Sequence, residues 1–149
     1  MATQWTAGTV SGQVLTAATL NTIGAAWVDY TPTLTQLATI TKTVVNARYC
    51  QIQKTVFVQV YLIATSAGTA GNILKIGLPI TARGANSSTT GIAQFYDAST
   101  NVLYVNSAYL DSTTACAFLY QTGNPWGVSP AITAAAGDQF QMNLTYEVA

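Results

Sequence analysis

The sequence predicts an all-β fold, an antiparallel, jelly-roll-like β-sandwich, preceded by a short helical segment at the N-terminus. Residues 139–148 alternate between apolar and polar side chains without exception, as a strand with one buried face does. After residue 30, short apolar runs recur at regular intervals, separated by clusters of turn-forming residues. No helical periodicity lies between these runs. This pattern is typical of sandwiches and jelly rolls.

Each expected strand follows from alternation bounded by turn chemistry. In residues 56–64, an aliphatic face alternates with a mixed aromatic and polar face that carries Phe57, Gln59 and Tyr61. The expected strands are residues 31–35, 38–45, 47–53, 56–64, 73–78, 91–96, 102–109, 114–120 and 139–148. Gly, Asn, Asp, Ser and Pro cluster in the intervening segments 66–72, 83–86, 97–101, 122–125 and 136–138.

The first thirty residues follow a different pattern. Leu20, Ile23 and Trp27 are spaced so that they share one face of a helix, and Thr16 is a suitable N-cap. Gly24 weakens the last turn, so we expect a helix of about eight to ten residues. A helix this short is marginal in water, so its apolar face must dock on something. We therefore divide the chain into an N-terminal anchor segment, residues 1–29, and a β-sandwich head, residues 30–149.

The composition is poor in charge. Of 149 residues only 7% are charged, with five basic and five acidic side chains, against about 25% in an ordinary soluble domain. No basic patch for nucleic acid or an anionic membrane is present. The absence of histidine excludes histidine-based triads and His-ligated zinc. We expect that much of the outer surface is buried in an obligate oligomer or a larger assembly.

The cysteine and targeting patterns predict a protein made in a cytoplasm. The N-terminus lacks the basic and apolar regions of a secretory signal, and no stretch approaches 18 consecutive apolar residues, so no membrane insertion is expected. Cys50 and Cys116 lie far apart in strand-like sequence. We expect two reduced cysteines that act as small hydrophobic residues, although sequence alone leaves a disulfide open.

No pattern in the sequence predicts catalysis. The acidic residues are not paired by spacing, and most adjoin turns; they are Asp29, Asp97, Asp111, Asp138 and Glu147. Neither a glycine-rich phosphate loop, nor Gly-x-Ser-x-Gly, nor Cys-x-x-Cys occurs. We expect a non-enzymatic protein with no cofactor, no metal and no catalytic residues.

Aromatic side chains are the candidate contact residues of the second half. They fall near expected strand ends and loops, and they are Tyr96, Tyr104, Tyr109, Tyr120 and Trp126. Such rings stack on sugars and anchor protein interfaces. Packing in the core or between subunits is the alternative to a receptor contact, and both remain open.

Two segments resemble virion proteins of tailed phages. Residues 12–21, Gly-Gln-Val-Leu-Thr-Ala-Ala-Thr-Leu-Asn, resemble an entry segment at the start of many tail-fibre and minor tail proteins. Residues 47–56, Ala-Arg-Tyr-Cys-Gln-Ile-Gln-Lys-Thr-Val, resemble the strand pair of the same proteins, with Gln53 where the family has a turn glycine.

The resemblance implies a homotrimeric head held on a phage virion by its N-terminal segment, as a tail fibre or minor tail protein. The anchoring residues would be Trp5, Leu15, Leu20, Ile23 and Trp27. The implied partners are further copies of the chain, a tail or major capsid protein, and a host surface glycan. A capsid decoration or head-fibre protein that stabilises the shell is one alternative, and a carbohydrate-binding module is another.

Overall fold

The computed structural model describes residues 26–85, 90–120 and 123–149. In these residues the fold is all-β and antiparallel, as predicted, and contains no helix. The strands are β1 (Val28–Asp29), β2 (Leu34–Gln36), β3 (Ala38–Thr39), β4 (Lys42–Ile52), β5 (Thr55–Ala64), β6 (Lys75–Gly77), β7 (Thr90–Asp97), β8 (Val102–Leu110), β9 (Ala115–Leu119) and β10 (Gln139–Glu147). The expected helix up to residue 25 and the anchoring residues Trp5, Leu15, Leu20 and Ile23 lie outside the described residues. Trp27, the last residue of the expected helical face, is described and lies just before β1, in no helix.

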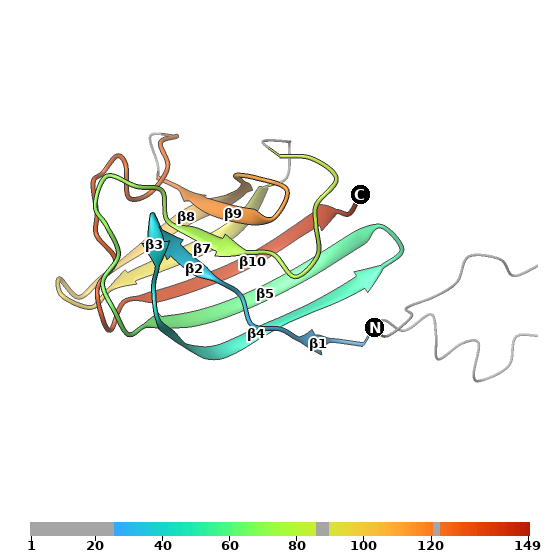
Figure 1. The fold of residues 1–149 in the computed structure, drawn as a ribbon, viewed down its shortest axis with the longest axis horizontal. Helices are drawn as coiled ribbons and strands as arrows, with labels where there is room; N and C mark the ends of the chain where they lie inside the picture. The colour runs from blue at the N-terminus through green and yellow to red at the C-terminus, as the bar shows by residue number, and fades with distance from the viewer. Residues whose placement is uncertain (1–25, 86–89, 121–122) are drawn as a thin grey trace, which may run out of the picture.

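The described strands form one 10-stranded sheet in the order β1-β4-β5-β10-β7-β8-β9-β6-β2-β3. Figure 1 shows the long strands β4, β5 and β10 side by side, with the sheet curling over so that β6 and β2 lie above them. The hydroxyl of Tyr30, just after β1, donates to the carbonyl of Gly77 at the end of β6, 3.4 Å away. Opposite parts of the sheet are thus linked, and the whole is a curled half-barrel.

The strand boundaries differ from the sequence prediction in several places. The expected strand 38–45 is divided between β3 and β4, with residues 40–41 in neither, and β1 was not among the expected strands. The expected break at residue 46 is absent, because β4 continues through it with a β-bulge between Val44 and Asn46. Of the expected strand 31–35, only Leu34 and Thr35 belong to a strand, β2. Pro32 has no N–H to donate to a neighbouring strand. Gln53, in the turn between β4 and β5, has φ 53°, the left-handed conformation that favours glycine.

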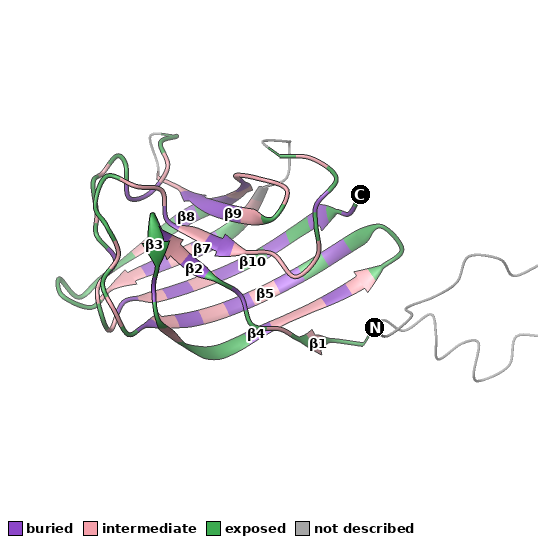
Figure 2. Cartoon of the chain, viewed as in Figure 1, coloured by how far each residue is buried: buried purple, intermediate pink, exposed green. Residues whose placement is uncertain are grey.

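Alternating burial divides the sheet into an inner and an outer face. Along β5 and β10, buried residues alternate with more exposed ones in Figure 2. The inner side chains form a single hydrophobic cluster, and its largest fully buried members are Phe95, Phe118, Phe140, Leu34, Ile40 and Leu62. The inward residues of the long strands therefore pack against those of β2, β6 and β9.

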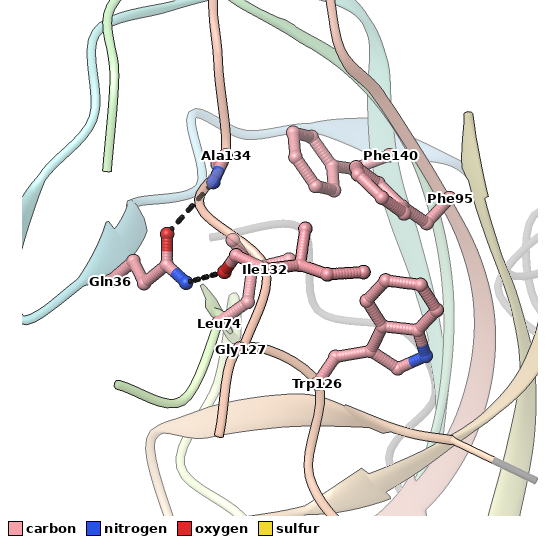
Figure 3. Close-up of a pocket in the computed structure, with 8 residues that line it drawn as sticks. All are labelled: Gln36, Leu74, Phe95, Trp126, Gly127, Ile132, Ala134 and Phe140. Atoms are coloured by element: carbon pink, nitrogen blue, oxygen red, sulfur yellow. Dashed lines mark hydrogen bonds between the residues drawn. The ribbon is translucent and has the colours of Figure 1, made fainter. Parts of the chain in front are cut away.

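Gln36, a polar residue of β2, lies inside this core and is 1% exposed. Its amide nitrogen donates to the carbonyls of Asn72 at 3.2 Å and Ile132 at 2.6 Å. Its amide oxygen accepts from the backbone N–H of Ala134 at 3.0 Å. Figure 3 shows the bonds to Ile132 and Ala134. One side chain therefore joins β2 to two long loops that have no regular partner strand.

Two glycines make room for this amide. A Cβ at Gly68 would collide with the Gln36 amide oxygen. A Cβ at Gly127, whose φ is 93°, would collide with the Asn72 carbonyl and approach the Gln36 amide nitrogen. The small cavity beside Gln36, between Phe95, Trp126 and Phe140, measures about 10 Å³, about the size of one water molecule. The loops therefore close on Gln36 with no room for a larger group.

Asp138 fixes the neighbouring hairpin in a similar way. Its carboxylate is 1% exposed and accepts from the backbone N–H groups of Ala98 at 3.0 Å and Ala135 at 2.8 Å. Burial raises the pKa of this carboxyl, and the two backbone donors act in the opposite direction. The turn between β7 and β8 is thereby held against the start of β10.

We predict that Gln36→Leu lowers the free energy of unfolding by about 2–4 kcal/mol, because it leaves buried backbone groups on both loops without partners. Urea unfolding monitored by tryptophan fluorescence measures the change. Gln141→Leu is the control, because Gln141 lies on the outer face of β10; a change within about 0.5 kcal/mol is expected there. Equal effects of the two substitutions would contradict the role given to Gln36.

Candidate functional site

The outer face of β4, β5, β10, β7 and β8 is the candidate functional surface. The strand register places its side chains in rows that cross the sheet. One row is Arg48, Gln59, Asn143, Ile92 and Ser107. The next is Tyr61, Gln141, Gln94 and Val105, and the third is Ile63, Gln139, Tyr96 and Leu103. Only Arg48 among them is charged.

Large apolar side chains stand on this face in contact with solvent. Ile92 is 65% exposed, Val105 60% and Leu103 54%. They lie on the neighbouring strands β7 and β8. On β10, the amide side chains of Gln139, Gln141 and Asn143 separate them from the residues of β5, which include the apolar Ile63. A soluble monomer rarely keeps such residues together, and a contiguous apolar patch marks an interaction surface.

A groove of about 440 Å³ crosses one end of this face. Its apolar walls are Trp27, Phe57 and Ile92, and its polar lining includes Gln59 and Asn143. β10 and β7 are paired only as far as Asn143 and Ile92, while β10 stays paired to β5 up to Glu147. The groove thus lies where β7 leaves its neighbour β10.

Arg48 fixes one wall of the groove. Its guanidinium carbon lies 4.8 Å from the centroid of a Trp27 ring. Its Nε and Nη2 both donate to the side-chain oxygen of Gln59, at 3.0 and 2.9 Å. A cation over an indole ring contributes about 0.5–1 kcal/mol at an exposed site. Trp27 is thereby held in place while 43% of it stays exposed.

Three of the five aromatic residues singled out in the sequence belong to one internal cluster. Trp126 is 2% exposed, and its indole N–H donates to the Asn106 side-chain oxygen at 2.6 Å. The rings of Tyr104 and Tyr120 lie 4.9 and 5.4 Å from that of Trp126, centroid to centroid. Phe95 packs on the same indole at 4.9 Å. A ligand could reach the Trp126 ring only if this core opened.

The other two aromatic residues lie on the outer face. The Tyr96 hydroxyl donates to the side-chain oxygen of Asn101 at 2.7 Å. The Tyr109 hydroxyl is 3.4 Å from Asp111, whose carboxylate forms an ion pair of 2.7 Å with Lys75. Burial, and then the Asp111 carboxylate, raise the pKa of Tyr109. Tyr96 borders Leu103 through its register pair, so it belongs to the exposed surface.

The exposed residues Phe57, Ile92, Leu103 and Val105 were not among the sequence candidates. A signal was present, because residues 102–105 are apolar at every position instead of alternating. A strand of this kind is apolar on both faces. No sequence pattern predicted the groove, because its walls come from segments far apart in the chain: Phe57 of β5, Ile92 of β7 and Trp27 just before β1.

The two cysteines are in different environments, and neither is in a disulfide. Cys116 is fully buried, and its thiol donates toward the Ile76 carbonyl at 3.4 Å and lies 3.0 Å from the Met142 sulfur. Burial raises its pKa to about 12. Cys50 lies on the outer side of β4 and lines the groove, and it is 7% exposed. Burial also raises its pKa.

We predict that iodoacetamide modifies Cys50 before Cys116 in the native protein. The thiolate is the reactive form, so a high pKa together with complete burial protects Cys116 until the chain unfolds. Intact-mass spectrometry over time measures both sites. In Cys50→Ala the native protein should take up no label at neutral pH, and rapid labelling of that variant would contradict the burial of Cys116.

The described residues contain no group of three or more His, Cys, Asp or Glu side chains placed to hold a metal ion. A search of the same residues finds no helix with the length and apolarity needed to cross a bilayer. Comparison with protein-family models, curated proteins and solved structures finds no match.

Proposed function

We propose that this chain is a non-enzymatic structural subunit of a phage virion, a homotrimeric surface appendage of the tail-fibre or minor-tail type. Its β-rich head, a jelly-roll-like sandwich in this proposal, packs against further copies through the outer sheet face. The N-terminal segment attaches the assembly to a tail or capsid protein. The observation that carries the proposal is the charge-poor outer face with Ile92, Leu103 and Val105 exposed on it.

The size of this face supports self-association. Four strands, β5, β10, β7 and β8, lie side by side. With strands about 4.8 Å apart and about eight paired residues at about 3.4 Å each, the flat area is on the order of 500 Å² before side-chain relief is counted. Each partner in a stable complex buries about 800 Å². The face is therefore large enough to supply most of one subunit contact.

The chemistry of the face supports a permanent contact. Obligate interfaces are poor in charged residues at their centre and resemble a protein core. The rows on this face carry Gln, Asn and Tyr instead of Lys and Glu. Amides and hydroxyls keep the free face hydrated, and they can be buried in pairs without the desolvation penalty of an ion.

We predict that the wild-type protein sediments as a trimer, with three times the 15.6 kDa subunit mass. Leu103→Lys and Val105→Lys should each weaken assembly by roughly 100-fold or more, because burying an ammonium group costs several kcal/mol. Val128→Lys is the matched control, since Val128 is an apolar residue, 44% exposed, in a loop. Sedimentation velocity measures all four proteins.

A folded wild-type monomer at micromolar concentration would contradict the trimer. Equal assembly of Leu103→Lys, Val105→Lys and Val128→Lys would show that another surface holds the subunits together. Circular dichroism of each variant verifies that the head is folded.

We predict that the double variant Trp5→Asp and Leu15→Asp assembles normally but fails to join particles, because both substitutions place a charge on the proposed anchor. Immunoblotting of purified virions measures incorporation, and electron microscopy of labelled particles locates the protein on tail or capsid. Thr9→Asp provides the control, a new charge in the same segment at a residue outside the anchoring set. Normal incorporation of the double variant would contradict the anchor.

A further inference from the structure

The groove on the outer face contains exposed apolar walls at the point where the described chain begins. Trp27 and Ile92 stand 43% and 65% exposed, and Phe57 39%, around a space of about 440 Å³. Apolar walls of this kind are covered in a working protein. The occupant must match a groove without any charged lining residue.

The chain's own N-terminal segment has the matching chemistry. Residues 1–25 contain no Asp, Glu, Lys or Arg, and they lead directly to Trp27. Ile23 and Leu20 lie four and seven positions before it. Four residues span about 6 Å in a helix and at most about 14 Å when extended. Ile23 is therefore within reach of the groove in either conformation.

We infer that Leu20 and Ile23 of each chain pack in its own groove, against Trp27, Phe57 and Ile92. The spacing of Leu20 and Ile23 puts these two aliphatic side chains on one face of the predicted helix. Trp27 itself lies just before β1 and outside any helix, so the short connection from Ile23 can turn this face toward the indole. The groove then acts as a socket that joins the anchor segment to the head. Trp5 and Leu15 remain outside it for contact with another component.

The short tether favours the chain's own segment over that of a second copy. A segment attached through a few residues has an effective concentration in the millimolar range. A second copy at micromolar concentration competes poorly against it. The inference concerns the subunit itself and holds whether or not the protein is a virion component.

Disulfide trapping in the full chain tests the socket, because Cys50 lines the groove. In Ile23→Cys a disulfide with Cys50 should form within one chain, on the order of tenfold faster than in Thr22→Cys, because only position 23 is held facing the groove. Thr22 is on the opposite side of the predicted helix. Ile23→Cys combined with Cys50→Ala should form no intrachain disulfide. Intact mass and non-reducing electrophoresis separate intrachain from interchain products.

Equal rates for Ile23→Cys and Thr22→Cys would overturn the inference, because they would mean that the segment is not seated. Disulfides formed only between chains would overturn it as well, since the occupant would be the segment of a second copy.

Hydrogen exchange of the full chain gives a second readout that does not depend on disulfide geometry. Amides of residues 16–26 should be protected in the wild type, and Ile92→Lys, which charges the groove wall, should remove that protection. Leu103→Lys lies on the same face outside the groove and should leave it unchanged. An unprotected wild-type segment, or equal protection in both lysine variants, would overturn the inference. Because Leu103→Lys is also the variant expected to weaken assembly, protection in that variant separates the socket from the trimer.

Discussion

The buried amide of Gln36 is the interaction on which the arrangement of the loops depends. The long loops between β5 and β6 and between β9 and β10 have no regular partner strand. Gln36 supplies the missing bonds, because it donates to Asn72 and Ile132 and accepts from Ala134. The same loops carry Trp126, whose carbonyl accepts from the Leu74 N–H at 3.1 Å. The position of the indole inside the core therefore depends on loops that converge on one side chain, and a buried group in such a network is costly to leave unpaired.

With the inner face fully occupied by a satisfied core, the outer face is where this chain can interact. In the described residues every buried side-chain nitrogen or oxygen has a partner. In the proposed trimer, the side chains of the outer rows are hydrated in the free subunit and buried in the assembly. Amide, hydroxyl and aliphatic side chains can be either hydrated or buried, whereas burying an ion carries a large desolvation cost. The one charged residue in these rows is Arg48 on β4, and Trp27 and Gln59 hold its guanidinium.

Local patterns in the sequence predicted the strands but not the contacts between distant segments. The alternation in residues 139–148 and 56–64 predicted β10 and β5, because burial on one face imposes a period of two. The strand β8 was predicted instead from the apolar run in residues 102–109 and the turn residues before it. Gln36 carried no such signal, since its partners Asn72, Ile132 and Ala134 lie far along the chain. The sequence left open whether Trp126 packs in the core or contacts a ligand, because its burial depends on the distant residues Asn106 and Tyr104 of β8. The groove arises from strand register, which single-strand patterns do not specify.

The groove and the exposed residues Leu103 and Val105 of β8 occupy different parts of one face, so the groove contact and the subunit contact proposed above do not compete for the same surface. Cyclic symmetry places equivalent points of each subunit at the same height along the axis. If copies pack through Leu103 and Val105, the Trp27 residues of a trimer lie at one level, and the segments that precede them start out from the same end of the head. If Ile23 also packs in the groove, each N-terminal segment leaves the head in a fixed direction. The segments of the three subunits could then bind one partner together, although each binds weakly. In the proposed trimer, such multivalent attachment would gain strength without new contacts per chain.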